Sequence, residues 1–206
     1  TAVGAGTVTF TFTSSSTGCA SAPTAVVAVT ACNSLAAVKV LLGGPYDESL
    51  DLMADNLRVG GLIPNAQPYG GSQYADFNYT GTETIGGGVL GTTGANAIVD
   101  WVMLELRSPV SPGAVLARKA ALVQRDGDVV ESSDGVSPVV FVGATAGSYY
   151  VAVKHRNHLG VMTAAPITLS GSVAISVNFT SASTNNYQLP GSTGSAYAQK
   201  TLSNGK

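Results

Sequence analysis

The sequence predicts an all-β fold, an Ig-like or transthyretin-like β-sandwich with strand-forming N- and C-terminal arms, and two observations lead to this prediction. Short runs of alternating apolar and polar residues recur along the chain, which is the period-two pattern of half-buried strands. Glycine and proline occur at nearly every junction between these runs, as in the tight turns that join short strands. With 206 residues the chain is long enough to bury a sizeable core. We therefore expect an uncharged strand arm (1–37), a β-sandwich core (38–180) and a polar tail (181–206).

The clearest expected strand is 7–13, because its alternation places Val8, Phe10 and Phe12 on one face and threonines on the other. The remaining expected strands, in chain order, are residues 25–30, 36–42, 98–107, 115–124, 138–142, 149–154, 167–169 and 173–179. Residues 48–57 are expected to form two turns of helix, since their apolar side chains recur at helical spacing. Residues 69–94 are glycine-rich and weakly patterned, and long excursions of this kind from a compact domain are often functional.

Charged side chains are concentrated in the middle of the chain. Residues 1–38 and 157–199 contain no Lys, Arg, Asp or Glu, and only Lys200 and Lys206 carry a charge outside residues 39–156. The two uncharged segments are rich in Thr, Ser, Val, Ala and Gly. This composition favours strands but lacks the charges that keep exposed strand edges from pairing with other molecules. We therefore expect these arms to be covered by another copy of the chain.

The composition excludes two classes of partner and indicates a compartment. Charged residues make up 11% of the chain, against a usual value of about 25%, so solubility must rest on uncharged polar residues, as in secreted or assembled proteins. The formal net charge of -2 offers no basic surface to nucleic acid. No apolar run approaches the roughly 20 residues of a membrane span. We expect an extracellular or cell-surface protein, and because the chain begins at Thr1 without a signal peptide, we expect it to be processed or cut from a longer one.

Cys19 and Cys32 are the only cysteines, and twelve residues separate them. In an exported chain they are expected to form a disulfide, which would stabilise the fold by about 3 kcal/mol in the chain-entropy model. Two buried thiols are the alternative, because a single pair of cysteines is weak evidence for an oxidising compartment.

Two acidic clusters are candidate calcium sites, and calcium is the one cofactor that the sequence brings into consideration. The first contains Asp47, Glu48, Asp51 and Asp55 within nine residues. Carboxylates crowded in this way resemble the oxygen-rich loops that bind Ca²⁺, but the spacing matches no EF-hand loop. The simpler interpretation is a solvated helical turn whose acids lie near its N-terminus.

The second cluster contains Asp126 and Asp128, on either side of Gly127 and between two expected strands. Asp-Gly-Asp first of all favours a hairpin turn, because Asp and Gly tolerate the positive φ of tight turns. A cation site at this position needs further oxygens from a neighbouring loop.

Both histidines of the chain, His155 and His158, follow the expected strand at 149–154. They are candidate contacts to a ligand such as a metal ion, but a three-residue spacing in a strand end or turn is not expected to bring the two rings together as a helix would. A structural hydrogen-bonding role is the favoured interpretation. A catalytic role would need a partner aspartate and a nucleophile, and neither a Gly-x-Ser-x-Gly nor a His-Glu-x-x-His motif is present. We predict no catalytic residues and no enzymatic activity.

Trp101, the only tryptophan, lies in the strand expected at 98–107. It is a candidate sugar-stacking residue, but packing in the core or between sheets is the favoured interpretation. The same alternation places Asp100 on the more apolar face, where an unpaired carboxylate would be costly. We therefore expect Asp100 to lie near a strand end beside a donor, and Arg58 or Arg156 to be its partner.

Several segments, taken together, resemble a module of large secreted or cell-surface proteins of Bacteroidetes-type bacteria. They are VKVLLGGPY (38–46), DNLR (55–58), GLIP (61–64), IVDWVMLELR (98–107), QRDGD (124–128) and YYVAVKHRNHLGVMT (149–163). The resemblance covers about residues 38–179 and implies a multidomain surface or secreted protein, often with adhesion-like repeats. It implies no catalytic function and carries over no active-site residues. Residues 198–206 resemble a segment after which such proteins usually continue.

The favoured function is a non-enzymatic extracellular structural subunit that assembles into a filament, sheath or surface layer. The mechanism would be β-strand addition, in which the arm at 7–13 pairs with an open sheet edge of another copy while Val8, Phe10 and Phe12 enter apolar slots. The competing interpretation is that this strand pairs within its own sandwich. The alternative function is a carbohydrate-binding or adhesive module that uses Trp101, Tyr69, Tyr74 or the acidic loops with calcium. A hydrolase is the weakest hypothesis.

Overall fold

The computed structural model describes residues 6–8, 11, 13–17, 20, 27–29, 33–181, 186 and 187. The chain divides into two compact units, Thr1–Cys32 and Asn33–Lys206. Strands dominate the described residues of both units, so the all-β class is confirmed. The boundary falls at Asn33 because the first strand of the second unit begins there.

The first unit contains a two-stranded antiparallel sheet of β1 (Gly6–Val8) and β2 (Val27–Val29). An isolated antiparallel bridge between Thr13 and Ala20 lies nearer the turn that joins the two strands. The described residues of this unit therefore belong to one β-hairpin.

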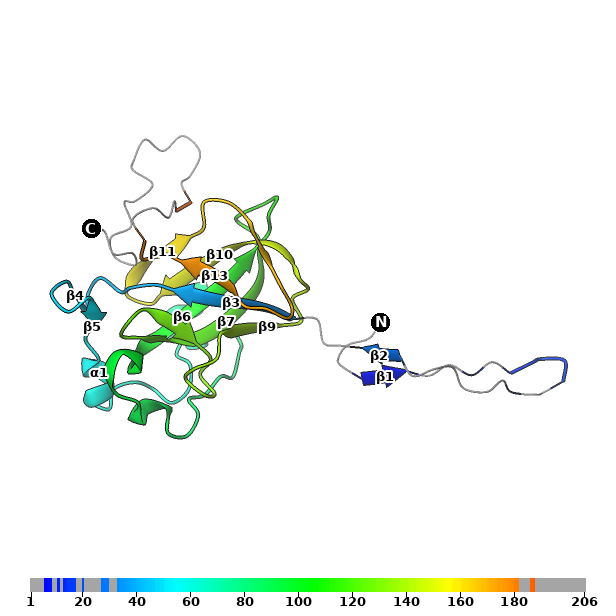
Figure 1. The fold of residues 1–206 in the computed structure, drawn as a ribbon, viewed down its shortest axis with the longest axis horizontal. Helices are drawn as coiled ribbons and strands as arrows, with labels where there is room; N and C mark the ends of the chain where they lie inside the picture. The colour runs from blue at the N-terminus through cyan, green and yellow to red at the C-terminus, as the bar shows by residue number, and fades with distance from the viewer. Residues whose placement is uncertain are drawn as a thin grey trace. The chain divides into compact units, whose positions relative to one another are not determined.

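The second unit is built on one nine-stranded sheet. Its strands are β3 (Asn33–Lys39), β6 (Ile98–Arg107), β7 (Val115–Gln124), β8 (Asp128–Val130), β9 (Val139–Val142), β10 (Gly147–His155), β11 (His158–Met162), β12 (Ile167–Leu169) and β13 (Ile175–Asn178). The order across the sheet is β11-β10-β6-β7-β8-β3-β13, with β12 paired to β10 and β9 paired to β3. Neighbouring strands are antiparallel except β13, which runs parallel to β3, as Figure 1 shows.

The sheet curls until its two sides meet at one end. β12 pairs with the first residues of β10, and the next residue, Ser170, forms a bridge to Leu35 of β3. The N–H of Leu35 donates to the carbonyl of Ser170 over 3.0 Å. β8 and β9 follow one another along the other side of β3, separated by residues 131–138. Facing parts of one curled sheet therefore enclose the core, as two layers do in a β-sandwich.

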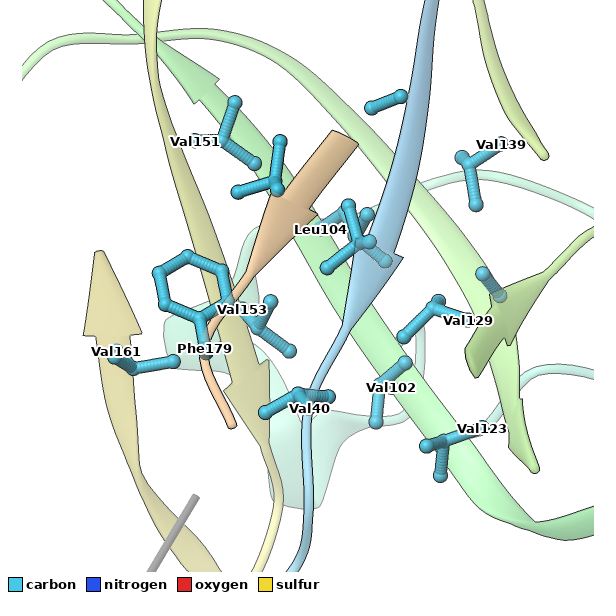
Figure 2. Packing of buried hydrophobic residues seen from close by; sticks show 14 of the residues in the cluster. Val40, Val102, Leu104, Val123, Val129, Val139, Val151, Val153, Val161 and Phe179 are labelled. Carbon is cyan, nitrogen blue, oxygen red and sulfur yellow. The ribbon is translucent and has the colours of Figure 1, made fainter. Parts of the chain in front are cut away.

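The main core lies inside this curl. Figure 2 shows Val102 and Leu104 of β6, Val151 and Val153 of β10, and Phe179 directed into the same space. Each of these five side chains is at most 1% exposed. Because full burial of a large apolar side chain stabilises by roughly 1.5–3 kcal/mol, this cluster is the main stabilising feature of the unit.

β6 is buried on both faces, because a second apolar cluster covers the outside of the sheet. A bulge between Ile98 and Asp100 shifts the pairing of β6 with β7. As a result, Val99 faces the main core on the same side as Val102 and Leu104, whereas Trp101 and Met103 face the second cluster. The sequence pattern alone had placed Val99 and Trp101 on the same face.

The long excursion between α1 (Asn56–Val59) and β6 supplies the other half of the second cluster. It contains three short 3-10 helices, η1 (Ser72–Phe77), η2 (Val89–Gly91) and η3 (Gly94–Asn96). Tyr69 packs against β6 in this cluster, and its hydroxyl donates to the carbonyl of Trp101 over 2.8 Å. The excursion, drawn cyan to green in Figure 1, is therefore a packed cover of the sheet. No helix among the described residues is long and apolar enough to cross a membrane.

The strands expected at 98–107, 115–124 and 167–169 are confirmed with the same bounds. The helix expected at 48–57 is wrong, because β4 (Tyr46–Asp47) and β5 (Leu52–Met53) form a hairpin there. The reason is local: Asp51 adopts a φ of 52°, in the left-handed region that suits a tight turn and interrupts a helix. The sequence did not predict β8 and β11, which are short and begin with a polar residue.

Leu104→Ala should lower the free energy of unfolding of the full chain by about 2–5 kcal/mol, because it leaves a cavity in the main core. Val142→Ala is the matched control, since Val142 lies on β9 with 77% exposure and should cost less than about 0.5 kcal/mol. Chemical denaturation followed by tryptophan fluorescence measures both values. Equal effects at the two positions would show that the main core is misidentified.

Candidate functional site

The clearest cluster of ionisable side chains lies where the start of β6 meets the turn between β10 and β11. Asp100 is near the beginning of β6, His155 ends β10 and His158 begins β11. The two histidines face each other across the hairpin as a register pair. Their ring centroids are 4.8 Å apart, so the expectation that a three-residue spacing keeps the rings separate is wrong.

Asp100 is buried, with 3% of its surface exposed, and three donors surround its carboxylate. Arg156 Nη2 donates to Oδ2 over 2.6 Å, His155 Nε2 lies 3.2 Å from the same oxygen, and the N–H of Trp101 donates to Oδ1 over 2.7 Å. Burial by itself would raise the pKa of Asp100, but the hydrogen bond from His155 and the positive charge of Arg156 outweigh it and lower that pKa below its usual value. The expected pairing of Asp100 with Arg156 is confirmed. Arg58 pairs instead with Asp55.

The contacts of Asp100 determine the tautomers of both imidazoles. An ionised carboxylate only accepts, so His155 Nε2 carries a proton and donates to Asp100. His155 Nδ1 is then an acceptor, which suits the N–H of Asn157 at 3.2 Å and requires a donor on His158 Nδ1 at 2.8 Å. His158 Nε2 is left as an acceptor, and the N–H of Gly44 donates to it over 3.3 Å.

The result is a continuous chain of hydrogen bonds from Gly44 through His158 and His155 to Asp100. It joins the loop after β3, the β10–β11 turn and β6, although Gly44 and His158 are 114 residues apart in sequence. Every ring nitrogen has a partner. The arrangement therefore fits the structural hydrogen-bonding role favoured for the histidines.

A cavity of about 310 Å³ lies beside this chain of hydrogen bonds. Leu42, Pro45, Leu57 and Val99 are among its apolar lining residues, and Asp100, Asn157 and the two histidines contribute polar atoms. A metal ion held by both histidines is disfavoured, because a ligating His158 Nδ1 would need its proton on Nε2, which faces the N–H of Gly44. Among the described residues, no group of three His, Cys, Asp or Glu side chains is placed to hold a metal.

The first acidic cluster is used for local turn chemistry. Asp47 Oδ1 accepts from the backbone N–H and the hydroxyl of Ser49, at 2.9 and 2.6 Å. The hydroxyl of Tyr46 donates to Asp51, and this hydrogen bond raises the pKa of Tyr46 to about 12. The two aspartates thus stabilise the β4–β5 hairpin, and this corrects the solvated helical turn that was the simpler interpretation.

The second acidic cluster forms the β7–β8 turn, as hairpin chemistry predicts. Asp126 Oδ1 accepts the N–H of Asp128 over 3.1 Å, and Gly127 between them has a φ of 93°. Asp128 pairs with Lys39 of β3 over 3.1 Å. A carbon atom added to Gly127 would lie 2.9 Å from the carbonyl oxygen of Val40, so this close approach also requires glycine.

The aromatic residues considered for sugar binding are mostly internal. Trp101 is fully buried, and its Nε1 donates to the carbonyl of Pro64 over 2.8 Å. Tyr69 is 1% exposed. Tyr74 is half-buried and packs beside Tyr69 with a centroid distance of 6.3 Å. The core role favoured for Trp101 is confirmed.

The residues predicted for the donated strand and the disulfide fall mainly in segments that the structure does not describe. Val8 belongs to β1, where only the backbone is described. Phe10, Phe12, Cys19 and Cys32 lie outside the described residues.

Two strand edges of the second unit carry polar side chains that block further pairing. β8 pairs with only the end of β7, and the hydroxyl of Tyr79 accepts the N–H of Ala120 on the remaining part of that edge. Lys119, beside it, lies 3.5 Å from Glu83 and 3.4 Å from Glu131. Glu131 also accepts the N–H of Val140 on β9 over 2.8 Å. Charges of this kind are a common protection of sheet edges.

The outer edges of β11 and β13 carry no such charged side chains, but among the described residues the edge of β11 is covered and that of β13 is not. Beyond β11, Asn186 bridges Thr163 and the N–H of Tyr187 donates to the carbonyl of Met162 over 2.8 Å. Tyr187 also packs edge-on against Tyr150, with ring centroids 5.7 Å apart. β13 ends the strand order, carries no charged residue, and has no partner strand on its outer side among the described residues.

Sequence reasoning missed the N–H of Gly44 and the pairing of the two rings, because neither contact leaves a signal in composition or spacing. Comparisons with protein-family models, with curated proteins and with solved structures found no match to this chain. The resemblance to secreted surface modules therefore stays a prediction.

Asp100→Ala should lower the free energy of unfolding by about 3–5 kcal/mol, because Arg156 loses its countercharge and His155 loses its acceptor. The matched control is Asp128→Ala, which removes an exposed partner of Lys39 and should cost at most about 1 kcal/mol. Urea denaturation at pH 7.5 measures both. A loss at position 100 no greater than that at position 128 would contradict the network.

Proposed function

We propose that this chain is a non-enzymatic extracellular structural subunit that assembles with other copies through β-strand addition. The observation that carries the proposal is the uncharged β-hairpin, which forms a compact unit of its own. No Lys, Arg, Asp or Glu occurs before Lys39, so neither strand of the hairpin carries a charged side chain that would prevent pairing with another strand.

A two-stranded hairpin is at best marginally stable in water, because each strand satisfies only one of its two edges. Pairing with a third strand supplies main-chain hydrogen bonds to one of the free edges and buries one face of the ribbon. Val8, Phe10 and Phe12 alternate along the sequence, so in this proposal they enter apolar slots of the partner while the backbone pairs.

The structure of the second unit favours β13 as the acceptor edge. The edges of β7 and β9 are guarded by Tyr79, Lys119 and Glu131, and the edge of β11 is covered by Asn186 and Tyr187. β13 carries Ile175, Ser176, Val177 and Asn178, none of which is charged. We therefore assign the hairpin of one copy to β13 of the next.

The histidine cluster supports the non-enzymatic part of the proposal, since its nitrogens are all engaged with protein groups. No observation favours the glycan-binding alternative, because the tryptophan it would use is buried. The absence of charged side chains from residues 1–38 and from β13 is better suited to strand pairing between copies.

Removal of residues 1–32 should leave a folded monomer that no longer assembles, because those residues form a separate unit and would supply the donated strands. Analytical ultracentrifugation and negative-stain imaging of the full chain and of the truncated chain measure assembly, and circular dichroism measures folding. A full chain that stays monomeric at high concentration, or a truncated chain that assembles equally well, would refute the proposed donor.

Ser176→Lys should raise the concentration needed for assembly at least about tenfold. A charge introduced on β13 would lose water at the new interface, at a cost of roughly 1–3 kcal/mol. Leu116→Lys is the matched control, because it adds the same charge at an exposed position on the guarded edge strand β7 and should leave assembly unchanged. Equal effects of the two lysines would exclude β13 as the acceptor.

A further inference from the structure

We propose that His155 and His158 form an acid-sensitive latch, which holds the loop after β3 against the β10–β11 turn at neutral pH and releases it when either imidazole takes up a proton. The latch lies within the folded second unit alone and does not depend on assembly. It rests on the geometry of the hydrogen bonds around the two rings.

In this chain of hydrogen bonds every imidazole nitrogen already donates or accepts, so neither ring can take up a proton without losing a hydrogen bond. His155 donates through Nε2 to Asp100 and accepts through Nδ1 from His158 and Asn157. His158 donates through Nδ1 and accepts through Nε2 from Gly44. A proton on His155 Nδ1 would face the two groups that donate to it, and a proton on His158 Nε2 would face the N–H of Gly44. Either protonation therefore breaks at least one link of the latch.

The charges around the rings do not compensate a new positive charge. From β6, Asp100 is the one carboxylate that contacts an imidazole, and Arg156 of the β10–β11 turn already neutralises it at 2.6 Å. From the outer cover, Tyr69 faces Asp100 and Arg156, and burial raises the pKa of Tyr69 so that it stays neutral.

The other elements packed around the rings add no compensating charge. The loop after β3 contributes the backbone N–H of Gly44. From the α1 side, Asn56 and Leu57 line the cavity, while Asp55 and Arg58 pair with each other. The cluster holds one negative and one positive charge when both histidines are neutral, so a further proton leaves an unmatched charge in a half-buried site.

The environment of His158 agrees with this geometry. Burial lowers the pKa of His158, the neighbouring His155 lowers it further, and Asp100 opposes both. The unfolded chain therefore binds a proton at this position more readily than the folded chain does. The stability that depends on neutral His158 is complete above the unfolded pKa of about 6.5 and is lost as the pH falls below it.

The first test reads the tautomers directly in the full chain. These are the only two histidines, so the long-range ¹H–¹⁵N spectrum of the imidazoles is unambiguous. At pH 7.5 we expect the proton of His155 on Nε2 and that of His158 on Nδ1. On acidification the amide signal of Gly44 should shift together with the imidazole signals, and its protection from hydrogen exchange, relative to the intrinsic rate at the same pH, should fall at least about tenfold. A His158 proton on Nε2 at pH 7.5, or a Gly44 amide that ignores the titration, would overturn the latch.

The second test compares unfolding equilibria at pH 7.5 and 5.5. His158 should account for up to about a tenfold loss of the folding equilibrium constant over this range. His158→Gln keeps an acceptor for Gly44 but does not titrate. The part of the pH dependence of folding that His158 contributes should therefore be absent in this variant. Asp128→Asn is the control, because it removes a surface carboxylate away from the latch and should keep the wild-type dependence. Full pH dependence in His158→Gln would refute the proposal. If that variant fails to fold, the wild-type imidazole spectrum decides.

Discussion

The second unit is organised around β6, a strand that is buried on both faces. A ten-residue strand in this position needs apolar material on each side, and two separate parts of the chain provide it. The curled sheet closes over one face, while the excursion that follows α1 covers the other. Buried strands of this kind have nearly continuous apolar sequences, and β6 follows the rule except at Asp100, Glu105 and its last residue, Arg107. Both acids are satisfied by arginines close by, at 2.6 and 2.5 Å.

The bulge at Val99 links the packing of β6 to the polar cluster. One extra residue lets Val99 and Val102 enter the same core although they are three positions apart, and it leaves Asp100 at the point where the ladder with β7 is interrupted. The backbone N–H of Trp101 turns to the Asp100 side chain at 2.7 Å. Bulges commonly redirect a side chain in this way. The hydrogen-bonded chain through the histidines therefore begins at a local irregularity of the central strand.

How much could be predicted from the sequence depended on whether a contact was local. The apolar patterns located the two ten-residue strands β6 and β7 to the residue, whereas β3 and β10 were found with different bounds. That Asp100 needs a partner was also predictable, because an unpaired buried carboxylate is costly, but the sequence left Arg58 and Arg156 as alternatives and only Arg156 pairs with it. The pairing of His155 with His158 depends on a hairpin that brings the two residues opposite each other, and the link to Gly44 depends on the curl of the whole sheet. Neither the bulge nor the hairpin between Tyr46 and Met53 leaves a periodic signal, so both were missed.

The distribution of charge connects the two proposals. Several charged residues lie along β6 and β7 and pair there: Lys119 pairs with Glu131, and Arg118 pairs with Glu105. Glu131 also accepts the backbone N–H of Val140 on β9. β13 has no such guard, and its pairing in the sheet is with β3. The loop that follows β3 is the segment held by His158. If both proposals hold, a proton taken up by the latch loosens the end of the strand on which the acceptor edge rests, so acid would weaken contacts between copies without any titratable group at the interface itself. The coupling requires that β3 transmit a displacement along its length.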